Sequence, residues 1–229
     1  ILGLIGWSYL VTALLYLVIR RRTAAFAAAI ILLYLLYFAD RTGLLAFLAP
    51  FNTWIGISSV LGSQPAITAS GALLSVMLFS LDQPHGVRIR IILLFALVLG
   101  TIAVLLHSLS DLSPLFIYNK NAATPPWCLI SSAWTALLFA LIYWLIDRLG
   151  LTTGTRMLAT AGQNALFAFI LGPIFYLLIG MLPLMADGRN LYAALGAGFA
   201  TGLWRSLLVA FAGTWLTAWM QRSGRYLRI

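Results

Sequence analysis

The chain has 229 residues, of which 62% are hydrophobic and 8% are charged, and its mean hydropathy is +1.01. This composition is typical of a protein whose main solvent is lipid, and it excludes an ordinary soluble domain. The net charge is +9, but nucleic acid is not an expected partner, because binding it would require a basic face on a soluble domain.

Long apolar runs follow one another along the chain. A transmembrane helix needs about 20 apolar residues, so the chain has room for about seven spans. Helices are expected because the alternation of barrel strands is absent. The expected spans are 3–19, 24–39, 64–81, 90–109, 127–147, 158–182 and 191–219. The sequence therefore predicts an all-α polytopic bundle, with residues 1–229 as a single transmembrane domain. The segment from Pro50 to Gly62 fits either a crossing or an amphipathic turn lying at the interface.

The basic residues between these spans fall mostly on one side. That set of loops and ends holds Arg20, Arg21, Arg22, Arg88, Arg90, Arg148, Arg156, Arg222, Arg225 and Arg228, whereas the other set holds Arg41, Lys120 and Arg189. Cytoplasmic loops collect Lys and Arg. We therefore expect a multi-pass protein of the plasma membrane, the inner membrane in a bacterium, with a cytoplasmic C-terminus and with Lys120 on the outer side.

The ends of the chain and its cysteine content carry further expectations. Ile1 stands almost inside a hydrophobic run with no charged leader before it, so we expect the chain to be the C-terminal part of a longer protein. The single cysteine, Cys128, has no partner for an internal disulfide and is expected to pack. No cluster of His, Cys, Asp or Glu has the spacing of metal ligands, so no metal cofactor is expected.

The most informative polar segment runs from Tyr118 to Trp127. It contains Asn119, Lys120 and Asn121 and continues into Pro125-Pro126 at the start of a span. The ammonium could hold a phosphate or carboxylate while the amides orient a carbonyl or a sugar hydroxyl. The alternative is a solvated loop lysine with asparagines that cap the next helix.

Three other polar positions interrupt apolar runs, where polar groups are costly. Gln163 and Asn164 can hydrogen-bond across a helix interface, as glue or as part of a site. Arg205 either binds an anion in a cavity or extends to the interface. His107 is a candidate general base or only a polar helix end. Gly198 and Gly202 mark a helix seam, either within one subunit or between the subunits of a homo-oligomer.

Several of these motifs occur in an order that resembles a known family. The strings Tyr118-Asn119-Lys120-Asn121, Thr124-Pro125-Pro126-Trp127, Tyr143-Trp144-Leu145-Ile146-Asp147 and Gly162-Gln163-Asn164-Ala165-Leu166 resemble the C-terminal half of heparan-alpha-glucosaminide N-acetyltransferases and their bacterial relatives. The resemblance is strongest over residues 117–170, and the remaining similarity is at the level of whole helices.

The resemblance implies a membrane acyltransferase that moves an acetyl group from acetyl-CoA to an amino sugar or envelope glycan on the far side. The candidate substrate or cofactor contacts are Asn119, Lys120, Asn121, Trp127 and Asn164, which lie in the matching strings, together with Arg205, which is named from its place inside the last span. Arg88, Arg90 and Arg156 are candidates for the CoA phosphates or set topology alone. The family's catalytic histidine lies in a part that matches nothing here, and His107 does not occupy its position. The alternatives are a transporter of an anionic solute and a non-catalytic membrane scaffold.

Overall fold

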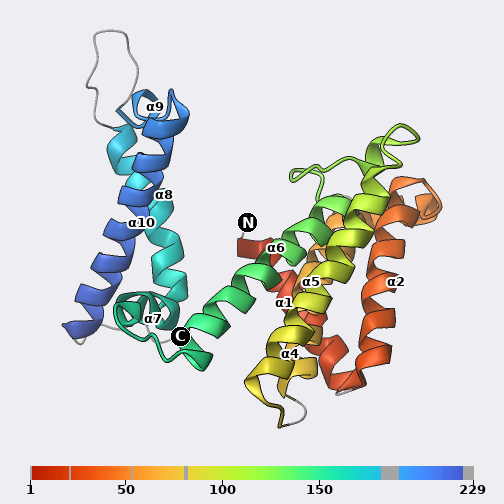
Figure 1. Ribbon diagram of the computed structural model, residues 1–229. Coiled ribbons are helices and arrows are strands. Elements are labelled where there is room, and N and C mark those ends of the chain that lie inside the picture. Colours follow the sequence, from red (N-terminus) through yellow and green to blue (C-terminus); the bar gives the residue numbers. More distant parts are fainter. Residues whose placement is uncertain (1, 21, 53, 80–81, 182–190, 224–229) are drawn as a thin grey trace. The chain divides into compact units, whose positions relative to one another are not determined.

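The computed structural model describes the chain except for residues 1, 21, 53, 80–81, 182–190 and 224–229 (Figure 1). Every regular element in the described part is helical, which confirms the all-α prediction. The chain forms two compact units, Ile1–Gly150 and Leu151–Ile229. Whether they act as the single transmembrane domain expected from the sequence stays a prediction.

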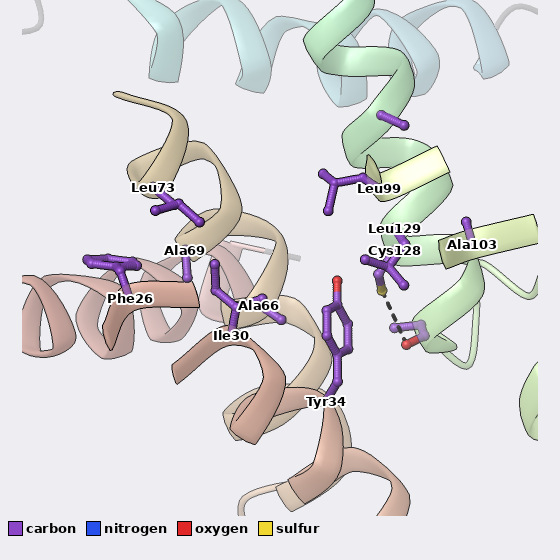
Figure 2. Packing of buried hydrophobic residues seen from close by; sticks show 12 residues of the cluster. Phe26, Ile30, Tyr34, Ala66, Ala69, Leu73, Leu99, Ala103, Cys128 and Leu129 are labelled. Carbon is purple, nitrogen blue, oxygen red and sulfur yellow. Dashed lines mark hydrogen bonds between the residues drawn. The ribbon is translucent and has the colours of Figure 1, made fainter. Parts of the chain in front are cut away.

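The first unit is a bundle of long helices joined by short helical turns. Its elements are α1 (Leu2–Ile19), α2 (Thr23–Arg41), η1 (Ala46–Leu48), α3 (Ala49–Asn52), η2 (Ile57–Ser63), α4 (Gln64–Phe79), α5 (His85–His107), η3 (Pro114–Phe116), α6 (Pro125–Tyr143) and η4 (Trp144–Arg148). The helix α5 packs along α6, α2 packs on η2 and α4, and α1 packs on α4. The buried faces of α2, α4, α5 and α6 meet in one hydrophobic cluster (Figure 2).

Four helical segments of the described chain are long and apolar enough to cross a membrane: Thr23–Arg41, Ile57–Phe79, His85–His107 and Pro125–Arg148. Two shorter apolar helices, Gly3–Ile19 and Ala165–Gly180, correspond to two further predicted spans. The expectation of a polytopic membrane bundle is consistent with these segments. The number of seven spans and the cytoplasmic C-terminus stay predictions.

The segment between α2 and α4, for which the sequence left a crossing or an interfacial turn open, divides into two parts. Phe51 and Trp54 are exposed, as an interfacial turn requires, but the chain then enters the π-helix η2, which continues into α4. Asp40 holds this entry, because its carboxylate accepts hydrogen bonds from Asn52 Nδ2 at 3.0 Å and Ser58 N at 3.1 Å. The segment that is long and apolar enough to cross a membrane therefore begins at Ile57, seven residues before the predicted start.

A close backbone approach joins η2 to α2. A β-carbon at Gly62 would lie 3.1 Å from the carbonyl oxygen of Leu33 and 3.3 Å from Tyr37 Cβ. Only a residue without a side chain lets these two helices come so close. The contact buries Tyr37 completely and thereby fixes the C-terminal half of α2 in the core.

The second unit differs from its predicted spans at two places. It contains α7 (Thr155–Gln163), α8 (Ala165–Gly180), α9 (Leu191–Ala194) and α10 (Phe199–Arg222). The predicted span 158–182 is broken at Asn164, whose φ of −120° and ψ of 45° are not helical, two residues after the poor helix former Gly162. The predicted span 191–219 is interrupted before Gly198, which adopts an extended conformation in front of α10. The helices α7 and α8 both pack on α10.

Candidate functional site

The loop from Ile117 to Thr124 is held by a compact set of hydrogen bonds. The buried hydroxyl of Thr124 donates to the carbonyl of Ile117 at 2.7 Å and accepts from the amide of Asn119 at 3.1 Å. Asn119 Oδ1 in turn accepts from the amide of Ala122 at 3.0 Å. The Asn119 side chain is therefore used to build a turn, the role that short polar side chains often take in loops.

The same loop is tied to two neighbouring helices. Tyr37 of α2 donates its hydroxyl to the carbonyl of Ala122 at 3.1 Å. Ala123 is buried and adopts a φ of 47°, a left-handed conformation that costs an L-residue about 1–2 kcal/mol. A residue persists in a strained conformation only where several surrounding contacts hold it there, and such residues cluster at binding sites and active sites.

The structure separates the candidate residues of this loop into exposed and packed groups. Lys120 and Asn121 are exposed, and the ammonium of Lys120 has no ion-pair partner in the described part of the chain. Trp127 is half-buried and packs against the core cluster, beneath Pro125 and Pro126, which open α6. The loop thus presents one ammonium and one free amide on a rigid base.

His107 ends α5 and lies against the base of this loop. Its ring stacks on Tyr118 with centroids 4.0 Å apart, and Nδ1 lies 3.1 Å from the carbonyl oxygen of Phe116. Because a carbonyl only accepts, Nδ1 carries the proton. These contacts give His107 a positioning role in the loop, and a role as general base stays a prediction.

The opposite end of the first unit carries a polar cluster that sequence reasoning did not assemble. His85 Nδ1 lies 2.9 Å from the hydroxyl of the buried Tyr143, and the two rings are tilted against each other. Arg88 Nη1 lies 3.5 Å from the same hydroxyl. Tyr143 can therefore donate to His85 while it accepts from Arg88. We call His85, Arg88, Tyr143 and Arg148 the arginine end.

Arg148 belongs to this cluster because its guanidinium lies 3.6 Å from the position that a β-carbon on Gly86 would take. Arg88 also lies 3.5 Å from the exposed carboxylate of Asp82, a contact worth little in water. Arg90 is exposed on the first turns of α5. The side chain of Arg156 lies outside the described residues. Cations beside the N-terminus of a long helix make this end suited to an anion.

The two ends divide the charges of the first unit as the sequence predicts. Helices α2 and α5 run in one direction and α6 returns, so Arg22, Arg88 and Arg148 stand at one end while Arg41 and Lys120 stand at the other (Figure 1). Which end faces the cytoplasm stays a prediction. Arg21, Arg189, Arg225 and Arg228 of the predicted charge sets lie outside the described residues.

The candidates in the second unit are engaged with their own neighbours. Arg205 Nη1 donates to the carbonyl of Tyr192 at 2.7 Å, and its guanidinium carbon lies 4.0 Å from the centre of the Tyr192 ring. Gln221 Nε2 donates to Gln163 Oε1 at 2.7 Å, as expected for amides that join two helices. Asn164 is half-buried at the junction of α7 and α8. The second unit therefore uses its polar groups mainly for packing.

Buried hydroxyl groups gather beneath the polar loop. Tyr34 and Ser63 are both buried, and the hydroxyl of Tyr34 has no hydrogen-bond partner among the described residues. Both hydroxyls approach the thiol of Cys128, which donates to the carbonyl of Ala123 at 3.3 Å. The only sequence signal for this cluster was a pair of tyrosines, Tyr34 and Tyr37, inside an otherwise apolar span.

Comparisons of the chain with family models, with curated proteins and with solved structures gave no match. The resemblance to the acetyltransferase family therefore stays a prediction.

Proposed function

We propose that the protein is the membrane part of an acyltransferase that moves an acetyl group from acetyl-CoA to an amino sugar or another envelope glycan. The observation that carries the proposal is the Ile117–Thr124 loop. Its backbone is fixed by Thr124 and Asn119, while Lys120 and Asn121 remain exposed. A site that is rigid before its ligand arrives avoids the entropy cost of ordering.

The two ends of the first unit suit the two substrates differently. The helix α5, with 23 residues, is about 35 Å long, so one phosphate group cannot contact both Arg88 and Lys120. The arginine end suits the phosphates of acetyl-CoA, because guanidinium groups bind phosphate oxygens with paired hydrogen bonds. The loop suits the acceptor, whose hydroxyl and amide groups match an ammonium and an amide.

The chemistry required of the chain is limited. Acetyl transfer to an amine or hydroxyl needs a base that removes a proton and a donor that polarises the thioester oxygen. Lys120 and Asn121 can supply hydrogen-bond donors. The resemblance implies that the base belongs to a region that matches nothing in these 229 residues, so the chain supplies binding and orientation.

The transporter alternative requires Lys120, Asn164 and Arg205 to line one route for an anion. Asn164 lies at a helix junction, and the guanidinium of Arg205 is held by Tyr192. No contact in the described chain favours a route over a binding site.

Calorimetric titration of acetyl-CoA into the full-length protein in detergent tests the donor site. Arg88→Gln should weaken binding at least tenfold, which corresponds to about 1.4 kcal/mol. Arg41→Gln removes the same charge at the opposite end and should leave the affinity within twofold. Absence of saturable binding by folded wild-type protein would contradict the proposal.

A transfer assay tests the loop. Lys120→Met keeps the length of the side chain but removes its charge, so transfer of radiolabelled acetyl groups to membrane glycans should fall at least tenfold. The acetyl-CoA affinity of this variant should stay within twofold, and Lys120→Arg should retain part of the activity. If Lys120→Met transferred acetyl groups at the wild-type rate, the loop would have no role in the reaction.

A further inference from the structure

An apolar groove of about 590 Å³ lies in the first unit between α2 and α5, with α4 and α6 as its floor. Its walls include Ile31 and Leu35 of α2, Val98 of α5, Met77 of α4 and Leu129 of α6. Ile31, Leu35 and Val98 are each more than half exposed on helices long enough to cross a membrane. The groove therefore opens onto the surface that hydrocarbon chains cover.

One polar group interrupts the apolar lining. Tyr34 lines the groove, and its side chain points towards Cys128 and Leu129 (Figure 2). Its hydroxyl is buried and has no hydrogen-bond partner among the described residues. An unpaired hydroxyl in an apolar environment costs about 1–3 kcal/mol, and hydrocarbon offers it no water. The hydroxyl has almost no accessible surface in this structure, so a ligand oxygen in the groove would remove this cost only after the Tyr34 ring shifts towards the groove.

The groove ends directly below the polar loop. Pro125, which follows the loop residue Thr124, lines the groove, and Tyr37 of α2 donates to the loop carbonyl of Ala122. Tyr34 stands seven residues before Arg41 at the end of α2, a rise of about 10 Å. A molecule with its chain in the groove would therefore have an oxygen at the depth of Tyr34 and a head group beside Lys120 and Asn121.

We propose that the groove holds the hydrocarbon chain of a lipid-linked glycan, and that this lipid-linked glycan is the acetyl acceptor. This inference rests on the proposed function and narrows its acceptor from glycans in general to glycans carried on a membrane lipid. When the chain binds, the Tyr34 ring shifts towards the groove, and its hydroxyl donates a hydrogen bond to an oxygen near the top of the chain. The sugar head lies at the loop, and the chain supplies most of the affinity through burial of apolar surface.

Photolabelling tests the site without any acetyl transfer. The probe is a glucosyl diacylglycerol with a diazirine in one acyl chain, at increasing mole fraction in phosphatidylcholine vesicles that hold the full-length protein. We expect labelling that saturates and that maps by mass spectrometry to the groove walls of α2 and α5. Labelling that rises linearly and spreads evenly over all lipid-facing helices would overturn the proposal, because it would indicate only a bulk lipid shell.

Two substitutions on α2 form a matched pair. Ile31 lines the groove and Leu32 does not, although both are exposed, by 59% and 64%. Ile31→Trp should fill the groove and lower saturable labelling at least fivefold, whereas Leu32→Trp should leave it unchanged. Tyr34→Phe should raise the half-saturating mole fraction about fivefold, the usual effect of one hydrogen bond. Equal effects of the two tryptophans would contradict the groove as the binding site.

The outcomes separate this inference from the proposed function. Saturable labelling of the groove by a protein that does not bind acetyl-CoA would support the lipid site and reject the acyltransferase. Binding of acetyl-CoA together with linear labelling would reject the lipid-linked acceptor alone. If the protein both binds acetyl-CoA and shows saturable labelling of the groove, Ile31→Trp should reduce acetyl transfer to the glycolipid and leave transfer to free glucosamine unchanged.

Discussion

The two units of the chain are similarly apolar in sequence but differ in how they bury their residues. The first unit contains two hydrophobic clusters built from α2, α4, α5 and α6. In the described part of the second unit, the buried residues are few, namely Leu171, Gly213, Thr217 and Ala218. Apolar composition therefore locates membrane helices, but it does not show which helices form a packed core.

The polar groups of the two units differ in the same way. In the first unit, hydrogen bonds hold a loop that leaves Lys120 and Asn121 exposed. In the second unit, Arg205 contacts Tyr192, and Gln163 contacts Gln221. The polar groups of the first unit are therefore placed to bind a ligand, whereas those of the second unit mainly join helices. The comparison predicts that substitutions in the first unit have the larger effects on both stability and binding.

The largest expected effect is at Gly62. Gly62→Val would push a branched side chain against the carbonyl of Leu33 and the backbone of Tyr37 and should cost about 3 kcal/mol by overpacking. The thermal unfolding midpoint in detergent, followed by tryptophan fluorescence, should fall clearly. Gly71→Val is the control, because a β-carbon there meets nothing within 4 Å. Equal midpoints for the two variants would show that η2 and α2 are not closely packed.

Thr124 should have the next largest effect. Thr124→Val keeps the shape of the side chain but leaves the carbonyl of Ile117 and the amide of Asn119 without their partner, at a cost of about 2 kcal/mol. Thr135→Val, within the helix α6 that follows Thr124, is the control, since its exposed hydroxyl bonds only to Ser131 in the same helix. Denaturation and hydrogen exchange of residues 117–124 measure the effect. Unchanged exchange in Thr124→Val would contradict the account of the loop.

Replacing Arg205 should lower stability less than the two changes above, and only within the second unit. Arg205→Met removes the hydrogen bond and the cation–π contact with Tyr192, which together are worth about 1–2 kcal/mol. Faster hydrogen exchange is expected around 192–205, with no change in the first unit. Arg222→Met at the exposed end of α10 serves as the control. A loss of acetyl-CoA binding in Arg205→Met would indicate that the second unit does contain an anion site.

The smallest effect is expected at the amide pair of the second unit. Gln221→Leu removes the hydrogen bond to Gln163 and should cost about 0.6 kcal/mol, the average for side-chain hydrogen bonds between membrane helices. Protease sensitivity of residues 155–163 in detergent should increase slightly. A change as large as that of Thr124→Val would mean that the second unit depends on its polar contacts more than the comparison allows.

Hydropathy predicted the helix positions of the first unit to within a few residues, because a run of apolar residues must pair its backbone within a helix. It did not predict the π-helix Ile57–Ser63 or the break at Asn164. Both depend on contacts or backbone angles that a local average of hydrophobicity does not contain. The close approach at Gly62 is such a contact.

The polar loop could be recognised from its sequence, because an Asn-Lys-Asn string before two prolines is unusual next to a span. The arginine end could not be recognised from the sequence, since His85 and Tyr143 are 58 residues apart and come into contact only when α5 packs on α6. The turn-building role of Asn119 was equally hidden, because a side chain that bonds its own loop and one that binds a ligand have the same residue type. The unpaired Tyr34 hydroxyl became visible only with its neighbours in place.

Hydrogen exchange measured with and without acetyl-CoA tests most directly whether the first unit carries the functional site. The account predicts slower exchange in residues 85–92 and 143–149, which contain the arginine end, and no change in residues 155–180 or 199–222. Protection confined to the second unit, or saturating binding without protection at the arginine end, would contradict it.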